Sequence, residues 1–410
     1  MRYPSILAMA HHDIMLFLIL AGMMSGSAVA FDSVYKMTFA SADPKAARQF
    51  IVTYLGGSYE IASINPECYH IEWVNLSHTV GTHLAFEMHF VKDWRYKNGG
   101  MTIDQFEDKM ANLHGAFTSF DEFMDYHLTL ATDDLDPVAL KLVADKKPLL
   151  VRKLHGNYSL FVEVPHGIVL EIVSSKLTVL KPKIWNRCGT PQRPDINFDA
   201  TFESESADGI SAPPPMYPIR AVYASTSPSA DADFFVNHFG GRRISDRELA
   251  ENSLGAGNGT CYEVQAVQLK SSSALPVTAI TEFELWWVYS PYLRQGNYTV
   301  KQHERFLKAV HSNISKEYDA YMDSHVGLWY DQSDSFIESL SRDRIPFFSS
   351  GTFGAGPHGQ VSYTGLFLQG PTGQVYEWLA LNQTLLPRTP TWPQLLCNGS
   401  AVPRDVTISI

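Results

Sequence analysis

The sequence predicts an α+β fold made of four units, each with the order strand, helix, strand, strand, strand. Two observations lead to this prediction. The chain repeats itself at a spacing of roughly two hundred residues, the scale of a domain, and each copy divides again into two such units. Within the units, alternating apolar and polar residues are bounded by turn residues and by helix starts that carry a proline.

The two copies match in the same order along their length. The matching stretches are Asp43–Gly57 with Ser227–Gly241, Phe86–Met88 with Phe283–Leu285, Met124–His127 with Met322–His325, and Leu160–Glu171 with Leu366–Glu377. They predict two domains, residues 31–189 and 217–400, followed by a tail at 401–410. Residues 190–216, which contain Pro213-Pro214-Pro215 and scattered acids, are typical of a solvated linker.

Local signals place the elements of the first unit. A strand over Val34–Ala40 leads into Asp43-Pro44, a cap followed by proline at the first helical position. The helix should end at Gly56-Gly57, where glycine permits a left-handed cap. Further strands are expected near Ser58–Ala62, Tyr69–Asn75 and Thr82–Val91.

The second unit shows the same succession of signals. It begins with a strand over His127–Thr132, and a helix opens at Asp136-Pro137. The stretch Leu160–Val173 closes the unit as two strands around a Pro-His-Gly turn.

The net charge of the chain argues against nucleic acid as a partner, and the first thirty residues indicate a secreted protein. The chain has 43 acidic and 32 basic residues, a net charge of -11, and no sustained basic run, so nucleic acid is not expected as a partner. Residues 1–30 read as a signal peptide, because Arg2 precedes the apolar run Ile14–Met24 and small residues precede Phe31. That run is short for a bilayer, so we expect a secreted protein without stable membrane insertion.

Other features are in keeping with the secretory pathway. Asn-x-Ser/Thr acceptors for glycosylation occur at Asn75, Asn157, Asn258, Asn297, Asn313, Asn382 and Asn398. The four cysteines are Cys68, Cys188, Cys261 and Cys397, without a CxxC pair, and an oxidising compartment favours disulfides. All three possible pairings respect the repeat symmetry. Independent folding of each copy favours Cys68 with Cys188 and Cys261 with Cys397.

Several polar residues lie in otherwise apolar strands. In Thr82–Val91, His83, Glu87 and His89 alternate with apolar residues, which describes either a ligand-lined face or simply a half-exposed strand. Glu171 and Glu377 lie within the apolar runs GIVLEIV and GQVYEWL. A carboxylate there is costly unless it binds a metal or is protonated or salt-bridged.

The chain contains paired strand–helix–three-strand units, with a His on the first strand of the second unit and the motif P-x-G-x-x-x-E at the end of that unit. In these features it resembles the vicinal oxygen chelate superfamily. Glyoxalase I, extradiol dioxygenases, fosfomycin-resistance transferases and bleomycin-binding proteins belong to this superfamily. The resemblance implies that each pair of units forms a curved mixed sheet with helices on the convex face and the site in the cup. It also implies that the two domains associate as an intramolecular pseudo-dimer.

The resemblance further implies metal ligands on the first and last strands of the units. These are Glu87, His127 and Glu171 in the first copy and Glu284, His325 and Glu377 in the second. Carboxylates and a neutral imidazole suit a divalent Fe, Mn, Ni or Zn ion. Glu87 or Glu284 could also leave the metal and act as a catalytic base. Alternatively, His127 and His325 could merely bond to the backbone.

One departure from the family pattern bears on function. The family's first strand commonly contributes His or Gln, whereas the strands here offer Tyr35 and Lys36 or Arg220 and Tyr223. Two functions therefore stay open. One is a secreted metal-dependent lyase, isomerase or dioxygenase that holds the vicinal oxygens of a small substrate. The other is a metal-free small-molecule or glycan-binding module, with Trp286 and Trp378 near its cup.

Overall fold

The structure is a computed structural model, and it describes residues 34–65, 69–78, 82–91, 105, 126–154, 157–165, 168–174, 213–252, 263–270, 282–291, 293–295, 298–310, 325–330, 333–353 and 363–381. The expected signal peptide, the four cysteines, most of the linker, the C-terminal tail and five acceptor asparagines (Asn258, Asn297, Asn313, Asn382 and Asn398) lie outside these residues. Within them, no helix is both long enough and apolar enough to cross a membrane.

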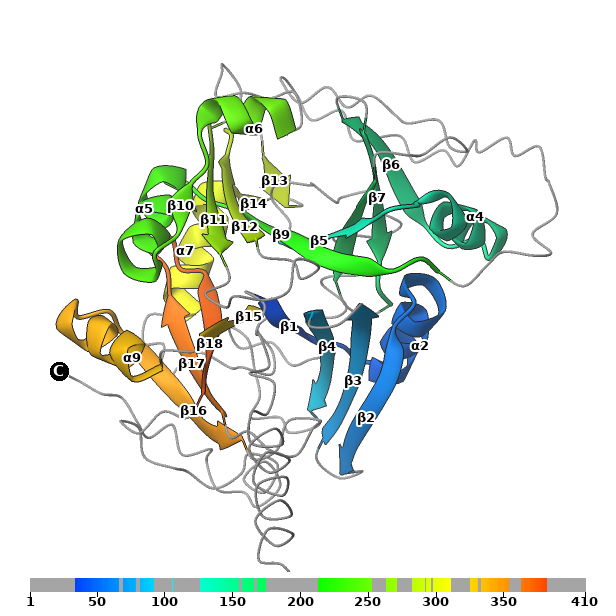
Figure 1. Cartoon of the computed structure of the whole chain (residues 1–410), viewed down its shortest axis with the longest axis horizontal. Helices are drawn as coiled ribbons and strands as arrows, with labels where there is room; N and C mark the ends of the chain where they lie inside the picture. Colours follow the sequence, from blue (N-terminus) through cyan, green and yellow to red (C-terminus); the bar gives the residue numbers. More distant parts are fainter. Residues whose placement is uncertain are drawn as a thin grey trace, which may run out of the picture.

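The described elements fall into four stretches, which we call units 1 to 4 (Figure 1). Unit 1 contains β1 (Val34–Ala40), α2 (Pro44–Leu55), β2 (Ser58–Asn65), β3 (Tyr69–His78) and β4 (Thr82–Val91). Unit 2 contains β5 (His127–Thr132), α4 (Asp136–Ala144), β6 (Leu149–Leu154), β7 (Asn157–Glu163) and β8 (Val169–Ser174).

Units 3 and 4 come from the second copy of the repeat. Unit 3 contains β9 (Met216–Ala224), α5 (Pro228–Phe239), β10 (Arg242–Arg243), α6 (Asp246–Asn252), β11 (Glu263–Lys270) and β12 (Glu282–Tyr289). It is followed by β13 (Arg294–Gln295), β14 (Tyr298–Thr299) and α7 (Val300–Val310). Unit 4 contains β15 (His325–Tyr330), α9 (Ser333–Arg342), β16 (Phe347–Phe353), β17 (Tyr363–Gln369) and β18 (Val375–Leu381).

Local capping explains where the first helix begins and ends. The Asp43 side chain accepts a hydrogen bond from the Ala46 backbone N–H at 3.0 Å, and Pro44 occupies the first turn. The helix ends at Gly56, whose φ of 70° is a left-handed conformation that costs glycine little. The predicted boundaries of β1, α2, β4 and β5 are confirmed.

Sixteen of the described strands form two eight-stranded mixed sheets, and β13 pairs with β14 in a separate two-stranded sheet. The first sheet has the order β16-β17-β18-β15-β1-β4-β3-β2, and the second has the order β10-β11-β12-β9-β5-β8-β7-β6. Unit 1 therefore shares a sheet with unit 4, and unit 2 shares a sheet with unit 3. In each sheet the two units join through their first strands, which pair antiparallel as β1 with β15 and as β5 with β9.

This pairing corrects the expectation that consecutive units share a sheet. The physical reason is that the first strand of a unit has one open edge, and any other unit's first strand satisfies its backbone groups equally well. Packing between the sheets, rather than any local signal, decides between these partners. Each sheet is thus shared between the two copies of the repeat.

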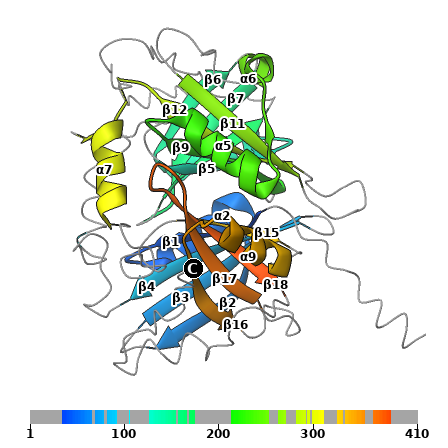
Figure 2. The same ribbon diagram turned by 90° about the vertical axis from the view of Figure 1, so that its left-hand side faces the viewer.

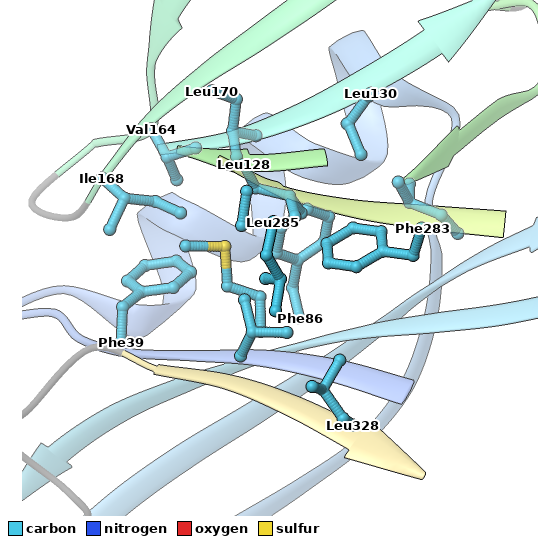
Figure 3. Packing of buried hydrophobic residues seen from close by; sticks show 14 of the residues in the cluster. Phe39, Phe86, Leu128, Leu130, Val164, Ile168, Leu170, Phe283, Leu285 and Leu328 are labelled. Atoms are coloured by element: carbon cyan, nitrogen blue, oxygen red, sulfur yellow. The ribbon is translucent and has the colours of Figure 1, made fainter. Parts of the chain in front are cut away.

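The two sheets lie one above the other with the main hydrophobic core between them (Figure 2). Figure 3 shows Phe39, Phe86 and Leu328 of the first sheet meeting Leu128 and Leu285 of the second, and all five are at most 1% exposed. Helices α2, α4, α5 and α9 contribute to the same core. Burying this many large apolar side chains is the main stabilising contribution to the association of the sheets.

Specific polar contacts also join the two sheets. The indole N–H of Trp287 on β12 donates to the hydroxyl of Tyr376 on β18 at 3.0 Å. At the start of α5, the carboxylate of Asp231 accepts from the hydroxyl of Thr372, in the β17–β18 turn, at 2.7 Å. Both pairs are buried, so each hydrogen bond fixes one sheet against the other.

Candidate ligand sites

Polar residues occupy the outer face of each sheet, opposite the shared core. Side chains alternate along a strand, so Met37 and Phe39 of β1 point into the core while Lys36 and Thr38 lie on the other face. On β18, Tyr376 and Trp378 belong to the core, and Glu377 lies on the outer face between them. On the second sheet this outer face is partly apolar, because Trp286 packs in a smaller cluster with Leu249 of α6 and Val300 of α7.

In the first sheet a row of residues crosses three neighbouring strands. Lys36 on β1 pairs with Gly327 on β15, and Gly327 pairs with Glu377 on β18. The Lys36 ammonium nitrogen lies 3.1 Å from Glu377 Oε2, and the two side chains are 7% and 1% exposed. This is a buried ion pair that spans the junction between units 1 and 4.

The same carboxylate oxygen has a second partner. His325 Nε2 lies 3.1 Å from Glu377 Oε2, and a carboxylate charged beside Lys36 favours the tautomer whose proton is on this nitrogen. The imidazole edge packs against the ring of Phe367 on β17, with 5.3 Å between the ring centroids. Glu377 is thus both neutralised and hydrogen-bonded, which is what burial of a carboxylate requires.

Glycine at position 327 makes the ion pair possible. A Cβ atom there would lie 2.7 Å from Lys36 Cγ and 3.3 Å from Glu377 Oε2. The lysine side chain therefore passes directly over the glycine to reach the carboxylate. Any larger residue would obstruct this path.

The second sheet contains the same row with different residues. Arg220 on β9 pairs with Thr129 on β5, and Thr129 pairs with Glu171 on β8. The Thr129 hydroxyl donates to Glu171 Oε2 at 2.8 Å, and His127 Nε2 lies 3.6 Å from that oxygen. By register, Thr129 occupies the place of Gly327, and Arg220 the place of Lys36.

Arg220 makes a different contact from Lys36. Its guanidinium carbon lies 4.4 Å from the ring centroid of Trp286 on β12, away from Glu171. The indole N–H of Trp286 donates in turn to Glu284 Oε2 at 2.8 Å. Arg220 is 8% exposed, and its Nε has no hydrogen-bond partner in the described part of the chain.

The structure separates the ligand sets expected from the sequence. Glu87 belongs to the first sheet, whereas His127 and Glu171 belong to the second. Likewise Glu284 lies in the second sheet, and its expected partners His325 and Glu377 lie in the first. The expectation that each triple converges within one copy of the repeat is therefore wrong, because the units pair across the copies.

Glu87 and Glu284 also differ in register. Glu87 pairs with Thr38 on β1, whereas Glu284 pairs with Arg220 on β9, the counterpart of Lys36. The residue that pairs with Lys36 is Ala85, so Glu87 lies two residues further along its strand than the position that corresponds to Glu284. The side chains of Glu87, His83 and His89 lie outside what the structure describes.

The described residues do not fit the metal that the fold family implies. In the first sheet, the Lys36 ammonium and His325 Nε2 each lie 3.1 Å from Glu377 Oε2, so both compete with a metal for this carboxylate. In the second sheet, Glu171 accepts from Thr129, and Glu284 accepts from Trp286. No three His, Cys, Asp or Glu side chains among the described residues are grouped closely enough to hold an ion.

Four residues of these rows were not recognised from the sequence as functional. Lys36 and Arg220 were noted only as departures from the family's first-strand ligands, and Thr129 and Gly327 were not singled out. The repeat could have indicated them, because Lys36 and Arg220 precede the helix-starting Pro44 and Pro228 by the same number of residues. Thr129 and Gly327 likewise follow the strand-opening His127 and His325 by the same number of residues.

Two of the predicted glycosylation sites lie in described strands. Asn75 lies within β3, which pairs with a strand on each side, and Asn157 begins β7.

Comparison with known proteins gives likeness in fold. Neither a protein-family model nor a curated protein sequence matches the chain. A putative dioxygenase from Bacillus subtilis shares 11% identity at a TM-score of 0.44, over 90% of this chain and 91% of that one. Glyoxalase I from Zea mays shares 11% identity at a TM-score of 0.43, over 85% of this chain and 92% of that one.

A glyoxylase/bleomycin resistance protein/dioxygenase domain from Frankia sp. is also similar, with 11% identity and a TM-score of 0.23, over 35% of this chain and 90% of that domain. Likeness at this level says nothing about the chemistry of this chain.

Proposed function

We propose that this protein binds a small molecule on the outer faces of its sheets without a metal ion. The observation that carries the proposal is the position of the Lys36 ammonium, 3.1 Å from Glu377 Oε2. Lys36 lies on the first strand, where the resemblance implies a neutral metal ligand. A fixed ammonium there neutralises the buried glutamate and repels a divalent cation.

His325 supports the same proposal. A nitrogen that binds a metal must offer its lone pair, whereas His325 Nε2 donates its proton to Glu377. Occupation by a metal would require Lys36 to leave, His325 to rotate or lose its proton, and Glu377 to exchange both partners. Such a rearrangement opposes metal binding in the first sheet.

Metal analysis of the purified protein tests the proposal. We expect less than stoichiometric Fe, Mn, Ni and Zn, and no change in melting temperature on adding Mn²⁺, Ni²⁺ or Zn²⁺. Stoichiometric metal that is lost in Glu377→Gln would overturn the proposal.

The variant Lys36→Gln sharpens this test. It removes the ammonium and introduces an amide oxygen that can ligate a metal, so we expect it to gain affinity for one of these ions. Lys141→Gln is the matched control, because Lys141 on α4 is half-buried and its ammonium pairs with Asp145 and lies over the Tyr54 ring, away from these rows. We expect this control to bind metal no better than the wild type.

A further inference from the structure

The two rows differ in how their cations are neutralised. Lys36 has a carboxylate partner in the first sheet, Glu377. Arg220 holds the same register position in the second sheet, yet no carboxylate of the described residues lies within ion-pair distance of it. Only the second sheet therefore contains a buried cation that has no ion-pair partner among the described residues.

An unpaired buried guanidinium is unfavourable in the ligand-free protein. Arginine stays charged at any physiological pH, so it cannot relieve the cost of burial by losing its proton. The Trp286 ring stabilises the charge through its π face, but it accepts no hydrogen bond from the N–H groups. Arg220 Nε is buried without a hydrogen-bond partner in the described part of the chain, so an acceptor that reached it would satisfy this N–H group.

The neighbouring carboxylates are engaged elsewhere. Glu171 Oε2 accepts from Thr129, and His127 Nε2 lies 3.6 Å from the same oxygen. Glu284 lies across from Arg220 on the adjacent strand, but its Oε2 accepts from the Trp286 indole. These glutamates offset the positive charge only at longer range, and neither forms a hydrogen bond with the guanidinium.

We propose that Arg220 is the receptor for an oxyanion group, carboxylate or phosphate, of a small molecule that binds to the outer face of the second sheet. Trp286 holds the face of the guanidinium, which leaves the N–H edge for a bidentate contact. The proposal deepens the proposed function by naming the chemical class of the ligand. It does not depend on whether the first sheet binds a metal.

Thr129 is the positioning residue of this site. Its side chain stands where Gly327 leaves room for Lys36, so it obstructs the path from Arg220 to Glu171. Its hydroxyl also donates a hydrogen bond to Glu171 Oε2. Glycine at position 129 would open the path and allow Arg220 to pair with Glu171, as Lys36 pairs with Glu377.

Calorimetric titration of the whole protein tests the proposal, with benzoate and inorganic phosphate as probes and sodium chloride of equal ionic strength as the reference. We expect at least one probe to bind with a dissociation constant of about 1 mM, the range of a fragment-sized ligand. Binding of benzoate but not benzamide supports a carboxylate ligand, and binding of phosphate alone supports a phosphate ligand. Failure of both anions to bind the wild type beyond chloride overturns the proposal, whatever the variants do.

Variants locate the binding to the site. Arg220→Met should weaken binding at least about tenfold, while Arg342→Met, which removes an exposed arginine of α9, should leave it unchanged. Thr129→Gly should lose binding although Arg220 is retained, and Thr129→Ser should keep it. Full binding by Arg220→Met or by Thr129→Gly would refute the assignment. Metal content is measured on the same samples, because stoichiometric metal would overturn the proposed function, whereas lack of anion binding would overturn only the assignment of Arg220.

Discussion

Replacing Lys36 by methionine removes the ammonium while keeping most of the apolar stem. Glu377, which is 1% exposed, then loses its cationic partner and keeps the hydrogen bond from His325. At 3.1 Å and an effective dielectric constant of about 20, the lost attraction is about 5 kcal/mol. Breaking one partner of a buried pair typically costs about 3–5 kcal/mol, so we expect Lys36→Met to lower the free energy of unfolding by that amount.

Arg220→Met is the matched control for this prediction. It removes the cation at the equivalent position of the second sheet, where the described contact is with the Trp286 ring. A desolvated contact of that kind is worth about 2 kcal/mol or less, and removal of the buried charge offsets part of it. Urea unfolding of both variants, with unchanged m-values, gives the comparison.

The double variant Lys36→Met with Glu377→Leu should recover most of the lost stability, because it leaves no unpaired charge. A Lys36→Met variant no less stable than Arg220→Met would refute the ion-pair account of the first sheet.

Three further perturbations have defined outcomes. Gly327→Ala should lower the free energy of unfolding by about 1–3 kcal/mol in urea titrations, because its Cβ would lie 2.7 Å from Lys36 Cγ, and the loss should shrink in a Lys36→Ala background. Tyr376→Phe should cost about 1–3 kcal/mol, since it leaves the buried Trp287 N–H without an acceptor; a loss as small as that of Tyr59→Phe, an exposed tyrosine, would contradict the inter-sheet hydrogen bond. Burial raises the pKa of Asp231 to about 6, so the folded protein binds this proton more tightly than the unfolded chain, and the contribution of this group to stability is lost as pH rises from about 4 through 6. Thermal unfolding across this range should show a contribution of about 3 kcal/mol that Asp231→Asn abolishes; an identical pH profile in the variant would contradict it.

The local elements were predictable because short-range physics fixes them. Asp43 and Pro44 begin a helix, Gly56 ends it, and the alternation in β4 and β5 gives strands with one apolar face. The partner of each unit was not predictable. The open edge of β1 carries no side-chain signal that distinguishes β5 from β15, so the choice depends on the core formed between the sheets.

The site was predictable only in part for the same reason. A glutamate inside an apolar strand indicates a partner, and Glu171 and Glu377 both have one. The identity of the partner depends on which strands are neighbours, so Lys36 and Glu377, far apart in the sequence, could not be matched beforehand. The role of Gly327 and Thr129 became visible only once the two rows could be compared by register.

The central claim is that a lysine ammonium takes the place of a metal ion in the first sheet. Anomalous diffraction from crystals soaked in Mn²⁺ and, separately, in Zn²⁺ tests it most directly. The account predicts no anomalous peak beside Glu377 and electron density that joins the Lys36 side chain to its carboxylate. An anomalous peak within coordination distance of both Glu377 and His325, with Lys36 turned away, would contradict it.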